Sequence, residues 1–273
     1  MKYMKVDTPA IGVVTLRLNT NENTFMPAAT GLSGDKLVEL RASMEKLEIE
    51  ASVDTKPGYI SRAAGPKKSM AIKNARYEAI ERMSLSYWWS MGKSTLWKVN
   101  PEITKRLLRT YFPSVDFQLN IGFVEPVCGT GYVAVSLLQN TKLFPYAVLG
   151  SCYSSSPKSA MKKAFFESIQ SWSATNWLRK NNKKLMPYWD LGEIRRRSVE
   201  ISSSPDLDFE NETNFDNQKL LEFIPIKNIQ VKPHSGKYVA WVYLDKSIDL
   251  NFEITKLVKR KKETTKIFSE YNY

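Results

Sequence analysis

The chain has 273 residues, of which 42% are hydrophobic and 25% charged, an ordinary globular composition with enough apolar material for a sizeable core. No apolar run approaches the roughly 18–20 residues of a bilayer-spanning helix, and Asp7, Thr8 and Pro9 interrupt the lysine-containing start, which argues against a signal peptide. Two cysteines, Cys128 and Cys152, cannot build a disulfide framework, and a single histidine argues against a Cys/His zinc site. These features predict a reduced, cytoplasmic protein.

The charge balance favours an anionic partner. Forty basic against 28 acidic side chains give a formal net charge of +12. Such a surface suits a nucleotide, an acidic peptide, nucleic acid or a membrane surface, and charge alone does not choose among them. A basic surface whose only role is to keep the protein in solution would explain the same net charge.

The first part of the chain reads as a strand followed by two helices. Alternating apolar residues predict a strand at 11–17, and a Gly/Ser/Asp turn at 31–35 then opens a helix over 36–50. A Pro-Gly pair at 57–58 breaks the chain before a second helix, over 69–89.

The middle of the chain continues with a helix over 101–111, which has a proline at its first position. Three runs rich in Val, Phe and Tyr then predict strands at 119–124, 132–138 and 146–153. A long helix over 157–179 follows them.

The last part begins with a basic, aromatic patch at 180–189 and an arginine run at 195–197. A Ser/Asp/Glu/Asn-rich segment at 202–216 reads as a solvated loop, and the chain ends with strands at 224–231 and 238–244 and a basic tail at 246–273. Interleaved helices and neighbouring strands predict a single mixed α+β domain over 1–273, with largely antiparallel sheets packed against helices.

Two of the predicted helices repeat each other. Those over 69–89 and 157–179 match at an offset of 89 positions, and the matched pairs keep small, acidic, aliphatic and aromatic residues in step: Ala71/Ala160, Ala75/Ala164, Glu78/Glu167, Ile80/Ile169, Ser84/Ser173 and Trp88/Trp177. The helix over 36–50 joins at an offset of 33, because Ala42, Glu45 and Glu48 fall where Ala75, Glu78 and Glu81 fall. The three helices therefore share an Ala-x-x-Glu-x-x-(Glu/Gln) pattern, an internal pseudo-repeat.

The repeated pattern favours a metal and phosphate site. Residues three and four apart share one helix face, so Glu78, Glu81 and Arg82 project together. Carboxylates one turn apart on each of two facing helices form an acidic cage for a hard cation such as Mg²⁺, which takes oxygen ligands. The adjacent arginine suits a phosphate group, because guanidinium is planar, bidentate and always charged.

A structural interpretation stands beside the functional one. Glu78 and Arg82 are also spaced for an ordinary surface ion pair, and Glu45 and Glu48 for a charged helix face. A solvated face has no reason to recur with its alanines, aliphatic residue and tryptophan in step, which favours function. Gene duplication without retained chemistry stays open.

The motifs resemble those of the YcaO-like family over roughly residues 10 to 245, most strongly over 31–180. Residues 61–65 (SRAAG) and the helix bearing E-A-I-E-R at 78–82 resemble that family's central motif, an AAG turn that leads into an ExxER helix. Gly150 to Trp172, with E-S-I-Q-S, resembles the later motif of a glycine-led turn and a helix with E-x-x-Q-S. Gly31 to Glu48 resembles a worn copy of the first motif.

The resemblance implies an enzyme that uses ATP and Mg²⁺ to activate peptide backbone amides during the maturation of ribosomally made peptides, as an azoline-forming cyclodehydratase or a thioamide-forming enzyme. It implies magnesium ligation by the acidic residues of the first two motifs, Glu45, Glu48, Glu78 and Glu81. It also implies phosphate contact by Arg82 and a nucleotide site lined by Glu167 and Gln170. No Walker loop is present, and no residue is assigned as catalytic. The implied partners are a precursor peptide and a leader-binding or ubiquitin-activating-enzyme-like protein.

Departures from the family pattern keep a second hypothesis open. Met70 stands where the family has a further glutamate and Pro66 where it has asparagine, while Ile49 and Trp172 replace polar or basic residues. These changes suit a catalytically degenerate YcaO-like subunit that scaffolds a peptide-modifying complex. A basic nucleic-acid-binding protein is the third hypothesis, and the motifs disfavour it; a homodimer stays open.

The remaining motifs read as structural. Gly129-Thr130-Gly131 predicts a hairpin turn rather than a phosphate loop. Cys128 and Cys152, beside strand-like runs, are expected as small buried hydrophobic residues. The tryptophans at helical spacing are expected in the core. A cysteine nucleophile would need a base, and His234 is the single histidine in the chain.

Overall fold

A computed structural model describes residues 3–8, 11–16, 28–32, 36–51, 59–91, 96–112, 117–140, 147–180, 191–207 and 226–244 of the chain. Its strands are β1 (Tyr3–Thr8), β2 (Ile11–Leu16), β3 (Ala28–Leu32), β4 (Tyr59–Gly65), β5 (Leu96–Lys98), β6 (Gln118–Val124), β7 (Tyr132–Gln139), β8 (Ala147–Ser154), β9 (Ile226–His234) and β10 (Lys237–Leu244). Its helices are α1 (Lys36–Glu50), α2 (Lys68–Met91), α3 (Pro101–Tyr111), α4 (Pro157–Lys180) and α5 (Leu191–Ser203).

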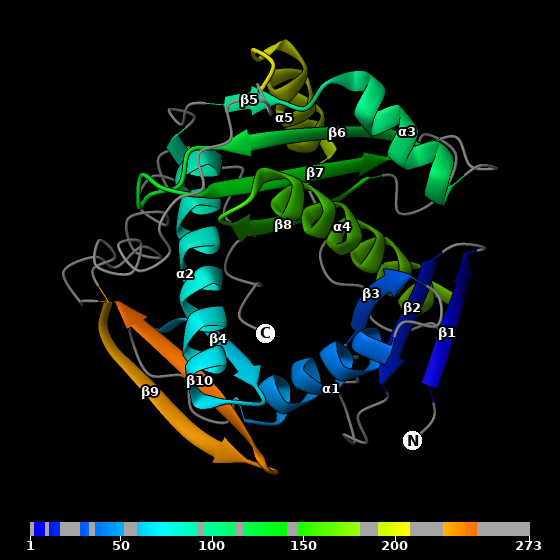
Figure 1. Ribbon diagram of the computed structural model, residues 1–273. Coiled ribbons are helices and arrows are strands. Elements are labelled where there is room, and N and C mark those ends of the chain that lie inside the picture. Colours follow the sequence, from blue (N-terminus) through cyan, green and yellow to red (C-terminus); the bar gives the residue numbers. More distant parts are fainter. Residues whose placement is uncertain are drawn as a thin grey trace.

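The strands form three antiparallel sheets, in the orders β1-β2-β3, β4-β10-β9 and β5-β6-β7-β8. Figure 1 shows the three sheets and the helices α1, α2 and α4 arranged around a common centre, with each helix near two different sheets. The mixed α+β class with antiparallel sheets, predicted from the sequence, is confirmed.

Helices α1 to α4 agree closely with prediction. α1 and α3 have the predicted bounds, and α2 and α4 extend the predicted ranges by one or two residues at their ends. At the start of α3, the side chain of Asn100 accepts the backbone N–H of Glu102, which caps the helix.

Three segments that the motifs describe as turns lie in strands. The AAG segment is the end of strand β4, and Gly150 lies inside strand β8, in agreement with the strand predicted at 146–153. Gly31, predicted to begin a turn, lies in β3. Each of these segments is strand because its backbone pairs with a strand distant in sequence, a fact that local residue preferences do not contain.

The start of the predicted loop at 202–216 differs from prediction, whereas the two predicted strands that follow it are present as β9 and β10. The arginine run at 195–197 lies in helix α5, and Ser202 and Ser203 end that helix instead of opening a loop. Residues 208–216 of the predicted loop and the predicted basic tail at 246–273 lie outside the described residues.

Small residues let α2 approach the sheet formed by β4, β10 and β9. Ala71, Ala75 and Ala79 are fully buried against that sheet. At the contact, the hydroxyl of Ser61 on β4 donates to the carbonyl oxygen of Ala75 at 2.6 Å. The opposite face of the sheet packs on α1, through Met44 and other apolar residues of that helix. The sheet is therefore covered by helices on both faces.

The four-stranded sheet is also covered on both faces. One face packs on α2 and α5, in a cluster that includes Ile80, Trp88 and Ile201. The other packs on α3 and α4, in a cluster that includes Phe165 and Ile169. α4 comes so close to β8 that a Cβ atom on Gly150 would lie 2.3 Å from the carbonyl oxygen of Ala164. Only glycine fits at this position, because any side chain would overlap the backbone of α4.

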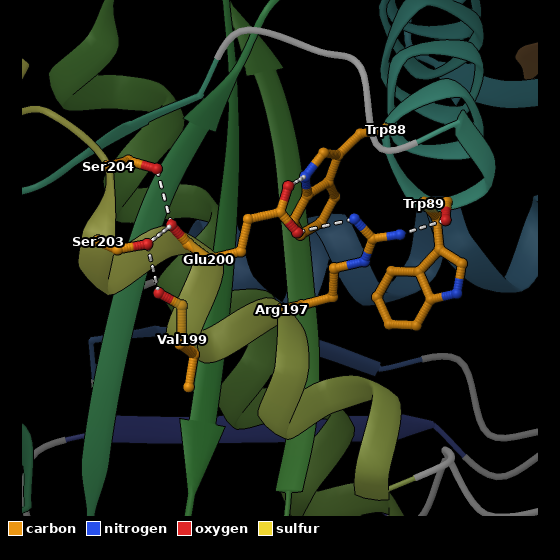
Figure 2. Close-up of polar contacts among 7 residues, drawn as sticks. All are labelled: Trp88, Trp89, Arg197, Val199, Glu200, Ser203 and Ser204. Atoms are coloured by element: carbon orange, nitrogen blue, oxygen red, sulfur yellow. Dashed lines mark hydrogen bonds and ion pairs between the residues drawn. The ribbon is translucent and has the colours of Figure 1, made fainter.

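Helix α5 fixes the C-terminal end of α2 (Figure 2). The guanidinium of Arg197, 1% exposed, donates to the carbonyl oxygen of Trp89 and to Glu200, the latter at 2.8 Å. The indole N–H of Trp88 donates to the same Glu200 carboxylate at 3.2 Å, and the guanidinium lies 5.0 Å from the Trp88 ring centre. Both tryptophans are buried, as the sequence predicted.

The smaller sequence predictions are confirmed. Gly129 and Gly131 have positive φ in the turn between β6 and β7, and Cys128 and Cys152 are buried free thiols. None of the described helices combines the length and hydropathy that crossing a bilayer needs.

Candidate functional site

Five glutamates from three helices lie close enough together to interact with one another. They are Glu45 and Glu48 on α1, Glu78 and Glu81 on α2, and Glu167 on α4. Each of them interacts electrostatically with at least one of the others: Glu45 with Glu78, Glu48 with both, Glu81 with Glu78, and Glu167 with Glu81, Glu45 and Glu78. The convergence expected from the repeated motif is therefore present.

The edge amides of β4 anchor two of the carboxylates. β4 is the edge strand of its sheet, so alternate N–H groups point away from its neighbour β10. The N–H of Ala64 donates to Glu48 at 2.6 Å, and that of Arg62 donates to Glu78. Both N–H groups are thereby satisfied by side chains from two different helices.

The edge amides of β8 do the same for two further carboxylates. The N–H of Tyr153 donates to Glu81 at 3.1 Å, and that of Ser151 donates to Glu167 at 3.2 Å. The Ser151 hydroxyl also donates to Glu81 at 2.5 Å, so both oxygens of that carboxylate are engaged by β8.

Crowding and burial favour the protonated form of these acids. Desolvation, followed by repulsion from Glu78, raises the pKa of Glu45 to about 7. Desolvation and neighbouring carboxylates likewise raise the pKa of Glu48 well above its usual range, and desolvation is the main cause of the raised pKa of Glu78 and Glu81. Protonation, or a bound cation, would therefore stabilise each of these carboxyl groups in the folded protein.

Glu167 behaves in the same way although it keeps an exposed surface. Desolvation by the protein atoms around it, together with the charge of Glu81, raises the pKa of its carboxyl group well above the ordinary value. The group is thus neighboured by protein on most sides while one side stays open, an arrangement that suits the binding of a small charged ligand.

Two arginines supply positive charge to the cluster. Arg82 forms an ion pair with Glu78, with both side chains more than a quarter exposed, and donates to the carbonyl oxygen of Ile60 at 3.1 Å. Arg62 is 4% exposed and lowers the pKa of Glu45, Glu48 and Glu78, while its Nη1 is a buried nitrogen without a hydrogen-bond partner. Arg62 was not predictable as a site residue, because an arginine in a short segment gives no sign of being buried.

Two further positions named from the motifs are Gln170 and Met70. Gln170 follows Glu167 by one turn of α4, and Met70, in the first turn of α2, is 45% exposed. In the part of the chain that the structure describes, no three His, Cys, Asp or Glu side chains form a group able to hold a metal ion by themselves.

The thiol of Cys152 is not an activated nucleophile. Burial, with the charges of Glu81 and Glu167, raises the pKa of the Cys152 thiol well above its usual value, which favours the unreactive thiol form. His234 lies beside Glu50 at 3.9 Å, at the end of β9. The site is therefore built of carboxylates and arginines, without a cysteine–histidine pair.

The sequence matches no protein-family model and no curated protein. The fold, in contrast, is similar to solved structures. The YcaO structure from Methanopyrus kandleri, bound with AMPPCP and Mg²⁺, superposes with a TM-score of 0.68 over 89% of this chain and 84% of that chain, at 12% identity. A chain of the E. coli microcin synthetase McbBCD complex gives a TM-score of 0.51 at 16% identity, over 85% of this chain and 64% of that chain.

These similarities agree with the motifs in the sequence and with the arrangement of the strands and helices that carry them. At identities this low, the superpositions show a shared fold and do not show a shared activity, which depends on the residues of the site. The chain therefore has the fold of the YcaO-like proteins.

Proposed function

We propose that this protein is an ATP- and Mg²⁺-dependent enzyme that activates backbone amides of a ribosomally made peptide. The observation that supports the proposal most strongly is the convergence of five carboxylates, each with a raised pKa, beside two arginines. A group of acids that repel one another is a costly arrangement unless a cation neutralises it. The M. kandleri structure, which shares the fold, contains Mg²⁺ and an ATP analogue.

The donor set fits magnesium. Mg²⁺ takes oxygen ligands and is usually held by one or two carboxylates together with substrate phosphates, so the proposal requires no group of three protein ligands. Glu45, Glu48, Glu78 and Glu81 are the residues that would provide the carboxylates. Mg-ATP, when bound, would supply the phosphoryl group that turns the amide oxygen into a leaving group.

The protein residues act by position and charge. Arg82 would contact a phosphate, and the partial exposure of its guanidinium beside Glu78 supports this role. Glu167 and Gln170 on α4 would line the nucleotide site. Phosphoryl transfer depends mainly on such positioning and charge neutralisation, so the chemistry needs no protein nucleophile. This agrees with the raised pKa of the Cys152 thiol.

Calorimetric titration with AMPPCP and Mg²⁺ tests the proposal. We expect micromolar affinity for the wild-type protein and a loss of at least tenfold in Glu78→Ala. The matched control is Glu102→Ala, which removes a 73% exposed glutamate from α3 and should leave the affinity unchanged. If the wild-type protein does not bind the nucleotide in Mg²⁺, the proposed enzymatic function is wrong.

A non-catalytic scaffold subunit is the second candidate. Two observations favour it: Met70 replaces an acidic residue of the family motif at an exposed position, and both oxygens of Glu81 are already engaged by β8. Loss of nucleotide binding with retained binding to a partner protein would support this candidate over the enzyme.

The substrate we propose is a precursor peptide, as an azoline-forming or thioamide-forming reaction requires. We also propose a leader-binding partner protein, since the similar microcin synthetase chain is part of a complex. Modification of a leaderless peptide by the isolated protein would contradict the need for such a partner.

A further inference from the structure

The strand–helix pairs β3–α1, β4–α2 and β8–α4 are three copies of one unit. α2 and α4 have bounds exactly one repeat apart, at 68–91 and 157–180, and the strand that precedes each helix packs against it. The β4–α2 and β8–α4 copies also share a close contact, because Ser61 and Gly150 are 89 positions apart and meet Ala75 and Ala164, which are also 89 positions apart.

Each helix also contacts the strand of the next unit. α1 lies against β4, α2 against β8, and α4 against β3. The third contact returns to the first unit, so the three units close a ring, which Figure 1 shows around the centre of the molecule.

The hydrogen bonds of the glutamates follow this ring. In the first position of the motif, Glu78 binds the edge N–H of Arg62 and Glu167 that of Ser151, each on the strand of its own unit. In the second position, Glu48 of α1 binds Ala64 of β4, and Glu81 of α2 binds Tyr153 of β8. Ala64 and Tyr153 are 89 positions apart, as are Arg62 and Ser151, so the two junctions use equivalent edge amides.

We infer that the second motif position, Glu48, Glu81 and Gln170, clamps each unit of the ring to the edge strand of the next unit, and that Gln170 closes the ring onto β3. By the offset of 33, the amide equivalent to Ala64 is that of Gly31 in β3, which is the edge strand of its sheet. These residues are positioning residues: they hold β4 and β8 where the first-position glutamates meet.

The identity of the residues supports separate roles for the two positions. The first position is glutamate in all three helices, whereas the second is Glu, Glu and Gln. A clamp needs only an oxygen that accepts an N–H group, and the neutral amide of Gln170 provides one. A role in binding a cation at all three junctions would have required a third carboxylate, whereas Glu48 and Glu81 remain free to serve both roles.

The test uses protein without nucleotide and with EDTA, so that its result does not depend on the proposed function. Replacing a clamp by alanine leaves strand N–H groups without their acceptor, and we expect Glu81→Ala and Gln170→Ala each to lower the melting temperature by about 5 °C. Hydrogen exchange of β8 in Glu81→Ala should accelerate by about tenfold or more. Lys163→Ala, at an exposed position of α4, is the control and should change neither quantity.

The variant Glu81→Gln distinguishes a hydrogen-bonding role of Glu81 from a role as one of several carboxylates that repel each other. Glu81→Gln reproduces the residue at position 170 and should recover at least half of the stability lost in Glu81→Ala. If the carboxylate were merely a metal ligand held beside other acids, Glu81→Ala would instead raise the melting temperature, because it would relieve repulsion. That outcome, or an unchanged melting temperature in Gln170→Ala, would overturn the inference.

Discussion

The guanidinium of Arg197 donates to the carbonyl oxygen of Trp89, one of the last carbonyls of α2. The final turn of a helix leaves carbonyl groups without helical partners and carries partial negative charge, which a cation complements. The rigid placement of α2 matters because its middle carries Glu78 and Glu81. Helix α5 therefore contacts the C-terminal end of the helix that carries two of the five glutamates.

Replacing Arg197 by methionine should destabilise the protein by about 3 kcal/mol, because the Trp89 carbonyl and the Glu200 carboxylate lose their common donor. Denaturant unfolding followed by tryptophan fluorescence measures the change. Arg106→Met on α3, an exposed arginine, is the control and should change the unfolding free energy by less than about 0.5 kcal/mol. Equal effects of the two substitutions would show that Arg197 is not an anchor.

The ligand-free protein should lose stability as the pH rises. The pKa of Glu45 is about 7 in the folded protein, above the ordinary value of 4.5 that applies after unfolding. The folded state therefore binds more protons than the unfolded state between these two values, and the free energy of unfolding falls as the pH increases through this window.

Chemical denaturation in EDTA between pH 5 and pH 8 measures this dependence. Glu45→Gln removes the titrating group, so its unfolding free energy should fall less steeply over the same range than that of the wild-type protein. Parallel pH profiles for the two proteins would contradict the assigned pKa.

Binding of a metal and nucleotide should release protons at pH 7. A cation favours the ionised form of the carboxylates, whose raised pKa values leave part of them protonated beforehand. Titration calorimetry of AMPPCP and Mg²⁺ in two buffers with different ionisation enthalpies gives the number of protons released. We expect a smaller number in Glu45→Gln, and a wild-type enthalpy that is independent of the buffer would refute the prediction.

The repeated helix motif was the part of the site that the sequence could predict. Periodicity places Glu78, Glu81 and Arg82 on one face, and the offset of 89 residues relates that face to the one around Glu167. The partners of these acids could not be predicted, because the amides of Ser151 and Tyr153 become available only when β8 forms the edge of a sheet. Sheet edges depend on pairing between distant strands, and that pairing has no local pattern.

The same reasoning accounts for what the sequence did not show about Gly150 and Arg197. The strand through Gly150 was predictable, whereas the need for glycine there comes from the close approach of α4. Nothing in the sequence indicates that Arg197 is buried, because arginines are usually exposed, and only the tertiary contact with Trp88 and Trp89 shows it.

Gly150→Ala should destabilise the fold more than Gly129→Ala does. The new Cβ atom would lie 2.2 Å from the backbone nitrogen of Ser168 and 2.3 Å from the carbonyl oxygen of Ala164, so α4 would have to move away from β8. Such overpacking typically costs at least about 1–3 kcal/mol, and here the obstacle is backbone rather than a movable side chain. The displacement would also carry Glu167 away from the Ser151 amide.

Gly129→Ala is the matched control for this substitution. Its added Cβ atom meets nothing within 4 Å, and the positive φ of 69° is the main source of strain, worth about 1 kcal/mol. Thermal unfolding of the two variants should therefore show a clearly larger loss for Gly150→Ala. Hydrogen exchange at β8 should also accelerate in that variant alone. Equal losses would mean that α4 does not need its close contact with β8, and the shared architecture of the β4–α2 and β8–α4 units would then lack an energetic basis.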